Sequence, residues 1–222
     1  MSAPQRDFAV LGGSFDPVHQ GHISIAEKIS ECLGTTVRLL PVGVPPHKAR
    51  LVASPKQRLK MLELATLNQP SLVIDDVELM RDSVSYTFET LRTLRDQLGE
   101  TESLYFVLGM DAYLDLPSWH EWQSLLNVAH IVVCQRASAK TVPPALRLFE
   151  KIHRVRSIDE LKAASCGFVY YVENAAVEVS SSEVRARLRR GDPVTGLINP
   201  EVAAFISEQK LYRSTGDEGM SQ

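Results

Sequence analysis

The chain has 222 residues, and its 24 Lys and Arg residues against 27 Asp and Glu give a formal net charge of −3 and a pI near 6.1. This length predicts one domain with a substantial core, and the balanced charge argues against a general surface for nucleic-acid polymers. No segment approaches the ~20 apolar residues that span a bilayer, and the N-terminus lacks an apolar signal segment, so we expect a cytoplasmic protein without a membrane partner.

The three cysteines are Cys32, Cys134 and Cys166. Their odd number and wide spacing predict neither a disulfide framework nor a zinc site. We expect buried free thiols in a reducing compartment.

The first predicted elements are a strand at Phe8–Leu11, a glycine turn and an amphipathic helix at Ile23–Leu33. A helix N-terminus has unpaired N–H groups and a positive dipole end, which favour a phosphate. Gly12 and Gly13 allow close approach of a ligand, and His19 and His22 at the first helical turn would donate N–H groups to phosphoryl oxygens.

Other interpretations of the two histidines are a solvent-facing pair or a metal site. Metal ligation is less favoured, because the sequence has no His-Glu-x-x-His pattern and no cysteine cluster nearby. The turn also lacks the Gly-Lys-Ser/Thr of a Walker loop and the third glycine of the dinucleotide fingerprint.

Along the rest of the chain, short β-branched strands alternate with helical patterns. The predicted strands are 37–42, 72–75, 104–108, 130–134 and 168–172, and the predicted helices lie near 55–68, 85–98, 121–128 and 158–164. This alternation predicts an α/β fold, a Rossmann-like doubly wound parallel sheet with helices on both faces and ligands at the carboxyl ends of the strands.

A long loop from Gly43 to Ser54 follows the second strand and carries Pro45, Pro46, His47 and Lys48. Its position after a strand end places Lys48 on the ligand side of the sheet. A solvated proline turn is an equally good interpretation of the local sequence.

Near the C-terminus, Ser180, Ser181 and Ser182 precede a run of helix formers that ends at Gly191. Serine suits a helix N-cap and glycine a C-cap. The serine hydroxyls and Arg185 would bind a triphosphate tail, although an ordinary capped basic helix fits the same residues. The polar segment after Tyr212 is predicted to be a disordered tail.

The segment 13–22, Gly-Ser-Phe-Asp-Pro-Val-His-Gln-Gly-His, resembles the signature of the nucleotidyltransferase superfamily that carries the His-x-Gly-His element. The segment 179–185, Val-Ser-Ser-Ser-Glu-Val-Arg, is similar to the second motif of that superfamily, with Val179 and Ser182 in place of Ile and Thr. Two separated motifs in the expected order make a chance match improbable.

Within that superfamily the chain resembles the nicotinate mononucleotide adenylyltransferases from about Phe8 to Tyr212. The further matching motifs are 45–48 (Pro-Pro-His-Lys), 85–91 (Ser-Tyr-Thr-Phe-Glu-Thr-Leu), 109–111 (Gly-Met-Asp) with Trp119, and 191–212. After Arg136, Ala-Ser replaces a frequent Pro-Gly. The resemblance implies one nucleotidyltransferase domain at 1–212 with C-terminal helices, and a tail at 213–222.

The resemblance further implies transfer of the adenylyl part of ATP to nicotinate mononucleotide, giving nicotinate adenine dinucleotide and pyrophosphate in NAD biosynthesis. It assigns catalysis to His19, His22, Lys48 and Arg185. It assigns ATP binding to Gly12, Gly13, Ser14, Phe15, His19, His22, Gly109, Asp111, Ser181, Ser182 and Arg185. It assigns nicotinate mononucleotide binding to Ser14, Lys48, Thr87 and Trp119. Mg²⁺ would be bound through the ATP phosphates, with no metal site of the protein itself.

Trp119 alone is also compatible with a plain core aromatic, and Trp122 is left out of the site for the same reason.

The competing enzyme is a pantetheine-phosphate adenylyltransferase, which usually has Thr at the position of His19, and cytidylyltransferases come third. A regulatory nucleotide-binding module without catalysis is the alternative from another class. A homo-oligomer is compatible with the sequence, which does not decide the oligomeric state.

Overall fold

The structure is a computed structural model that describes residues 7–45, 51–135, 141–173 and 179–213. The first half contains β1 (Phe8–Gly13), α1 (Gln20–Leu33), β2 (Thr36–Pro41), α2 (Pro55–Thr66), β3 (Leu72–Ile74) and α3 (Thr87–Leu98). The second half contains β4 (Leu104–Gly109), α4 (Met110–Asp115), η1 (Leu116–Ser118), η2 (Trp122–Asn127), β5 (His130–Gln135), α5 (Pro144–His153), α6 (Ile158–Leu161), β6 (Val169–Glu173), α7 (Ser181–Arg190) and α8 (Pro200–Glu208).

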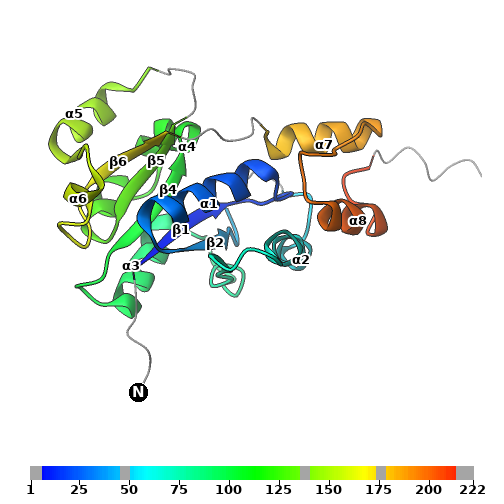
Figure 1. Cartoon of the computed structure of the whole chain (residues 1–222), viewed down its shortest axis with the longest axis horizontal. Coiled ribbons are helices and arrows are strands. Elements are labelled where there is room, and N and C mark those ends of the chain that lie inside the picture. Colours follow the sequence, from blue (N-terminus) through cyan, green and yellow to red (C-terminus); the bar gives the residue numbers. More distant parts are fainter. Residues whose placement is uncertain (1–6, 46–50, 136–140, 174–178, 214–222) are drawn as a thin grey trace, which may run out of the picture.

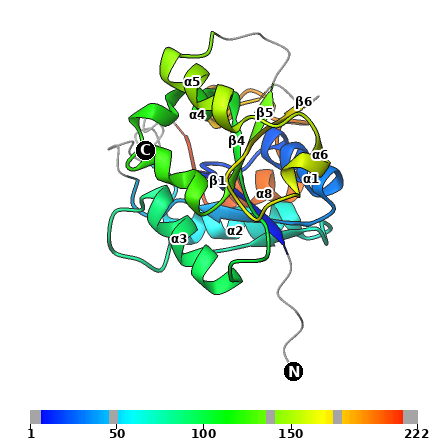
Figure 2. The ribbon, with the colours of Figure 1, turned by 90° about the vertical axis from the view of Figure 1, so that its left-hand side faces the viewer.

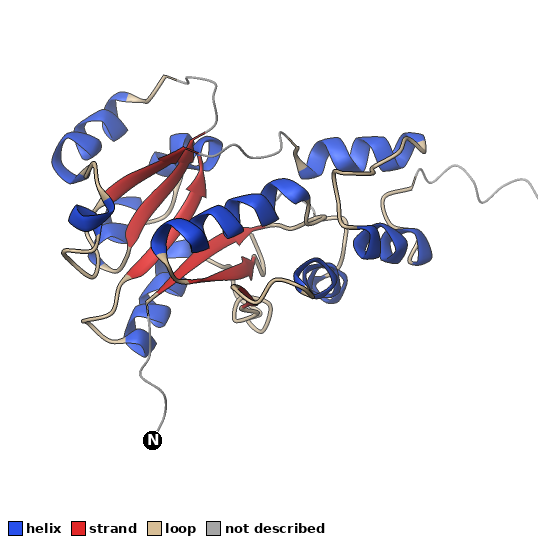
Figure 3. Cartoon of the chain, in the orientation of Figure 1, coloured by secondary structure: helices blue, strands red, loops and turns tan. Residues whose placement is uncertain are grey.

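The six strands form one parallel sheet in the order β3-β2-β1-β4-β5-β6 (Figure 3). This is the strand order of a doubly wound Rossmann-type sheet, so the predicted fold class is confirmed. The order reverses between β1 and β4. In such sheets ligands bind at that point, beyond the carboxyl ends of the two strands.

Alternate side chains of each strand enter opposite faces of the sheet, and both faces are covered. Ala9 and Leu11 of β1 belong to the core with α1 and α2, whereas Phe8 and Val10 belong to the core with α3. Figure 2 shows α1 and α3 on opposite sides of the strands. The strands are apolar on both faces because each face is buried.

Helices α7 and α8 lie beyond the carboxyl ends of the first strands, at the opposite end of the molecule from α5 (Figure 1). The Ser180 hydroxyl caps α7 by accepting the Glu183 N–H at 3.2 Å, and Gly191 ends the helix in the left-handed conformation at φ 73°. Both predicted caps are therefore confirmed. The predicted tail lies outside the described residues except for Arg213.

Two predicted helices differ from the structure. The segment near 121–128 forms the 3₁₀ helix η2, and the helix predicted at 158–164 is limited to α6, which ends at Leu161. The chain also contains α4 and α5, which were not predicted as separate helices. Two consecutive prolines make the start of α5 hard to predict from the sequence, although proline is well accepted in the first helical turn.

All three cysteines are free, as predicted, but only Cys134 is buried. Burial raises the pKa of the Cys134 thiol to about 12. The prediction of burial was wrong for Cys32 and Cys166, which are half-buried because they lie on α1 and in the turn before β6 rather than on a strand. Among the described residues, no helix has both the length and the apolar character needed to cross a membrane.

Candidate active site

The turn between β1 and α1 brings backbone and side chains close together at the carboxyl end of β1. Phe15 adopts a positive φ of 48°, which is uncommon for a residue other than glycine, and its ring is fully buried. His19 is the extended N-cap residue of α1, and His22 is the third residue of the helix. The predicted placement of both histidines at the first helical turn is confirmed.

The two histidines form a single unit. The backbone N–H of His19 donates to Nδ1 of His22 at 3.2 Å, and the two rings stack with centroids 3.7 Å apart. The edge of the Phe15 ring contacts His22 at 4.8 Å between centroids. Because Nδ1 of His22 accepts a hydrogen bond, a neutral His22 ring carries its proton on Nε2, which is then a donor.

The C-terminal motif contacts the same turn. Nη1 of Arg185 donates to the Asp16 carbonyl at 2.6 Å, and the Ser181 hydroxyl donates to the Pro17 carbonyl at 2.9 Å. Nη2 of Arg185 reaches the Ser182 hydroxyl at 3.2 Å. The structure thus brings the two sequence motifs together across more than 160 residues, as a common site requires.

Asp16 has a structural role that the sequence analysis missed. Its side chain is 2 % exposed and accepts hydrogen bonds from the backbone N–H groups of Val52 (2.7 Å) and Ala53 (3.0 Å) and from the Tyr212 hydroxyl (2.6 Å). Burial, followed by this contact with Asp16, raises the pKa of Tyr212. Asp16 therefore ties the turn to both the long loop and the C-terminal segment.

Arg58 of α2 is a second residue that the sequence analysis missed. Its fully buried guanidinium donates from Nη1 to the Ser14 carbonyl at 3.0 Å, while Nε and Nη2 have no hydrogen-bond partner among the described residues. Burial lowers the pKa of Arg58, and the nearby Asp16 carboxylate opposes that shift. The contact fixes the backbone immediately after β1.

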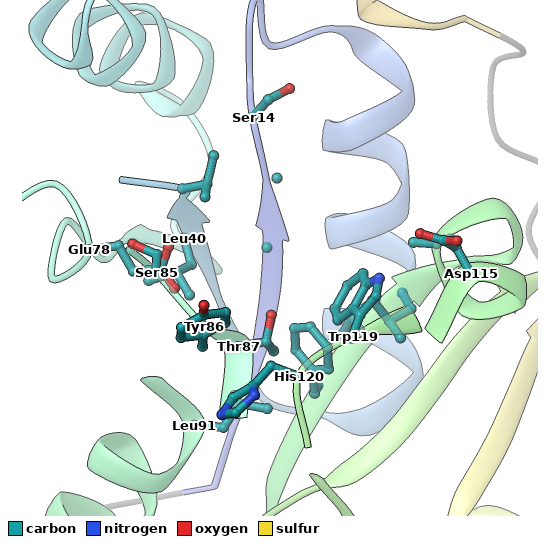
Figure 4. Close-up of a pocket in the computed structure, with 18 of the residues that line it drawn as sticks. Ser14, Leu40, Glu78, Ser85, Tyr86, Thr87, Leu91, Asp115, Trp119 and His120 are labelled. Carbon is teal, nitrogen blue, oxygen red and sulfur yellow. The ribbon is translucent and has the colours of Figure 1, made fainter. Parts of the chain in front are cut away.

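A cavity of about 690 Å³ opens beside this turn, between the carboxyl ends of β1 and β4 (Figure 4). This is the position at which a doubly wound sheet binds its ligand, and the volume suits a mononucleotide. Six of the predicted site residues line the cavity: Gly12, Gly13, Ser14, Thr87, Gly109 and Trp119.

The cavity wall also contains polar residues that were not predicted. Glu78 and Ser85 lie together on one side in Figure 4, and Tyr86 and His120 pack their rings 4.5 Å apart. Glu78 accepts the Thr90 hydroxyl at 2.8 Å, whereas the buried Ser85 hydroxyl has no hydrogen-bond partner in the part of the chain that the structure describes. Ser85 and Tyr86 belong to the matching motif at 85–91, but only Thr87 of that motif was assigned to the site.

The remaining predicted residues do not line the cavity. Phe15, His19, His22, Ser181, Ser182 and Arg185 surround the turn beside it, and Asp111 is exposed in the first turn of α4. Lys48 lies outside the described residues. Trp122 packs against Phe149 with centroids 5.0 Å apart and does not line the cavity.

The sequence and the fold were compared with known proteins. Residues 10–187 match the Cytidylyltransferase-like family. A protein of Aeromonas hydrophila named "Probable nicotinate-nucleotide adenylyltransferase" is 42% identical over 207 residues, covering 92% of this chain and 96% of the relative. A Yersinia pestis protein of the same name is 37% identical over 209 residues, covering 93% and 95%.

Solved structures show the same fold. The nicotinic acid mononucleotide adenylyltransferase of Plasmodium falciparum, complexed with NaAD, superposes with a TM-score of 0.72 at 21% identity and covers 93% of this chain and 97% of its own. A putative nicotinate-nucleotide adenylyltransferase from Vibrio parahaemolyticus gives 0.63 at 16% identity, covering 95% and 97%. With the two motifs joined beside a nucleotide-sized cavity, and with relatives matched over nearly their whole length, the chain belongs to the nicotinate-nucleotide adenylyltransferase family of cytidylyltransferase-like proteins.

Proposed function

We propose that the enzyme joins nicotinate mononucleotide to the adenylyl part of ATP and releases nicotinate adenine dinucleotide and pyrophosphate in NAD biosynthesis. The relatives named for this activity support the reaction. The observation that carries the assignment to this site is the contact of Arg185 and Ser181 with the histidine turn, next to the cavity.

The two substrates have separate places in this proposal. The cavity receives nicotinate mononucleotide, with the Trp119 indole as a stacking face for the pyridine ring and with Ser14 and Thr87 as polar contacts. ATP lies against the glycine turn and the N-terminus of α7, with its ribose near Gly109 and Asp111. Lys48 is assigned to the phosphates from the sequence motif alone.

The chemistry requires no covalent enzyme intermediate. A phosphate oxygen of nicotinate mononucleotide attacks the α-phosphorus of ATP and forms a new P–O bond, while the bond from the α-phosphorus to the α,β-bridging oxygen breaks and its electrons leave with pyrophosphate. The nucleophile is already ionised, so no general base is needed. The main obstacle is the repulsion between two phosphate groups.

The proposed catalysts act by positioning and by neutralising charge. The Nε2–H of His22 is directed by the contact of Nδ1 with the His19 backbone, which gives a preorganised donor for a phosphoryl oxygen. His19, Lys48 and Arg185 add positive or donor groups around the same phosphates. Arg185 is held at the turn by the Asp16 carbonyl before ATP arrives.

The ATP substrate is its magnesium complex in this proposal. Within the described ranges, His, Cys, Asp and Glu side chains form no group of three or more suited to a metal ion. In nucleotide sites, Mg²⁺ is usually held by phosphate oxygens and water, and we assign it that position here. The free cysteines and the use of ATP support a cytoplasmic location.

The test is pyrophosphate release by the purified enzyme with ATP and magnesium, offered nicotinate mononucleotide, nicotinamide mononucleotide or phosphopantetheine in parallel. We expect the highest kcat/KM with nicotinate mononucleotide. Activity with phosphopantetheine alone would refute the proposed substrate, and thermal stabilisation by ATP without turnover would identify a regulatory module.

A further inference from the structure

A second cleft of about 610 Å³ lies between α5 and β6, at the end of the molecule opposite α7 and α8 (Figure 1). It is separate from the active-site cavity, because the two share no lining residue. Its lining includes four cations, Arg147, Lys151, Arg154 and Arg156, together with Glu150 and Tyr171. Four cationic side chains therefore face one carboxylate.

The four cations of the second cleft lie close together on α5 and the segment that follows it. Arg147, Lys151 and Arg154 are spaced by four and three residues, which places them on one face of α5 and at its C-cap. Arg156 follows two residues later. In the part of the chain that the structure describes, the side chains of Arg147, Lys151 and Arg156 have no ion-pair partner.

The negative end of α5 explains only part of this charge. A cation in the last helical turn offsets the partial charge of about −0.5 at the C-terminus, and Lys151 occupies that turn. Arg147 lies one turn earlier, and Arg156 lies beyond the helix. These two arginines keep positive charge that the helix end does not require.

The other lining groups hold the cleft in a fixed shape. The Arg154 guanidinium lies over the Tyr171 ring, 4.2 Å from its centroid, which is a cation–π contact. Glu150 accepts hydrogen bonds from the Tyr171 hydroxyl and, at 3.1 Å on the same oxygen, from the Tyr113 hydroxyl. The single carboxylate is thereby committed to two phenols of the protein.

We propose that this cleft is a second anion-binding site, which takes a chain of two or three phosphates, either inorganic or attached to a nucleoside. Forked guanidinium groups suit phosphate oxygens, and a cleft of this volume suits a small ligand. The four cations are exposed at the cleft in a protein of net charge −3, and this small local cluster does not favour a nucleic-acid polymer.

The site has a direct connection to the active site through Tyr113. This fully buried residue belongs to α4, which also contributes Ala112 and Asp115 to the active-site cavity. In this proposal, a bound polyphosphate gathers the cleft cations beside Glu150 and so changes the contact of Glu150 with the Tyr113 hydroxyl. We infer that occupancy alters the affinity for ATP, an inference that rests on the proposed place of the ATP ribose beside α4.

Calorimetry tests the binding site without relying on activity. Inorganic tripolyphosphate, GTP and adenosine are each titrated into enzyme saturated with nicotinate adenine dinucleotide, so that the active site is occupied. We expect binding of tripolyphosphate or GTP but not adenosine, with affinity reduced about tenfold in Arg147→Gln/Lys151→Gln. The control Lys28→Gln/Lys60→Gln removes two exposed charges elsewhere and should bind like wild type.

Whichever of tripolyphosphate and GTP binds more tightly shows whether the ligand is an inorganic phosphate chain or a nucleotide. Equal affinities in both double variants, or binding of neither tripolyphosphate nor GTP, would overturn the proposed site.

Steady-state kinetics test the connection. At fixed free magnesium, tripolyphosphate should change the KM for ATP about fivefold in wild type, a typical allosteric coupling, and far less in Arg147→Gln/Lys151→Gln. Tyr113→Phe keeps the ring but removes the hydroxyl that donates to Glu150, so it should retain tripolyphosphate binding and lose the KM shift. An identical shift in all three proteins would show competition at the active site and refute the connection. Absence of pyrophosphate release in wild type would instead refute the proposed function.

Discussion

The buried polar side chains at the two ends of the parallel sheet differ in how fully they are hydrogen-bonded. At the amino ends of the strands, the nearly buried Arg95 donates to four backbone carbonyls, those of Val128 (2.8 Å), Gly99 (2.7 Å), Glu102 (2.6 Å) and Ser165 (2.8 Å). Nearby, Nε2 of the buried His130 contacts the Ala164 carbonyl at 3.0 Å, and its Nδ1 accepts the Phe168 N–H at 3.2 Å. Both side chains join segments that precede different strands.

At the carboxyl ends of the strands, some buried polar side chains keep hydrogen-bonding atoms that are not used. Within the described ranges, the side chain of the buried Arg58 makes one hydrogen bond and leaves Nε and Nη2 without a partner, and the Ser85 hydroxyl has none. Buried polar groups without partners cost stability, so their presence beside the cavity needs a reason. Arg95 and His130 at the amino end bond to backbone groups of the protein, whereas the Ser85 hydroxyl at the carboxyl end lines the cavity, where it can meet a ligand. Substitutions at the two ends should therefore affect different quantities.

His22→Ala should lower kcat about 1,000-fold, equivalent to about 4 kcal/mol of activation free energy, because it removes a directed donor to the phosphoryl group. The free energy of unfolding should change little, since His22 is only half-buried. Turnover and urea unfolding measure the two effects. His120→Ala, in the cavity wall, is the matched control and should change KM rather than kcat. An unchanged turnover number in folded His22→Ala would remove this residue from the mechanism.

Arg95→Met should show the opposite pattern at the other end of the sheet. Loss of the guanidinium leaves four backbone carbonyls without a donor, and we expect the free energy of unfolding to fall by about 3 kcal/mol. The KM and kcat of the folded fraction should stay at wild-type values. Urea unfolding measures the loss, and Arg92→Met, an exposed position on the same helix, should change it by less than about 0.5 kcal/mol. A selective loss of kcat in Arg95→Met would contradict the division between the two ends.

The stability of the enzyme should also depend on pH through His130. Burial lowers the pKa of His130 from 6.5 to about 4, so the unfolded chain binds more protons than the folded protein between these values. Stability contributed by the neutral ring is complete above pH 6.5 and falls by about 2.5 kcal/mol as the pH is lowered to about 4.5. Urea unfolding across this range measures the loss. His130→Gln, which does not titrate, should be less stable at pH 7 but should lack this part of the pH dependence of the unfolding free energy. The same pH dependence in both proteins would rule out His130 as its source.

Local patterns were enough to predict most of the fold and part of the site. Alternating strands and helices gave the doubly wound sheet, and Ser180 and Gly191 marked the ends of α7, because caps and hydrophobic periodicity are local properties. Asp16, Arg58 and Tyr212 were missed as a group. Each acts through partners distant in the sequence, and no spacing rule reports such contacts.

The type of an element was harder to predict than its presence. The segment at Trp122–Asn127 has apolar residues at a helical spacing but forms a 3₁₀ helix, a type that is common in short connecting pieces. Trp119 shows the same limit in the site. Its role as a cavity wall depends on the turn after η1, and sequence alone left a core aromatic equally plausible.

Trp119→Ala tests the cavity directly. Removal of the indole should raise the KM for nicotinate mononucleotide about tenfold, with a smaller effect on the KM for ATP, because a stacking face for the pyridine ring is lost. Steady-state kinetics with each substrate varied in turn measure the two values. Trp122→Ala is the control, since this tryptophan packs on Phe149 and should reduce stability without changing either KM. Equal effects of the two substitutions on KM would place Trp119 outside the nicotinate mononucleotide site.

Tyr212→Phe should have the smallest effect and bears on how the carboxyl end is assembled. It removes one buried donor to Asp16 and leaves the two backbone donors, so we expect a loss of about 1 kcal/mol in the free energy of unfolding. Because Asp16 holds residues 52 and 53, the KM for ATP should rise modestly with the ring packing retained. Tyr105→Phe, which removes a buried hydroxyl at the amino end of β4, is the control and should leave KM unchanged. If both variants behave alike, the Asp16 contact contributes to packing only and the C-terminal segment does not help to position the turn.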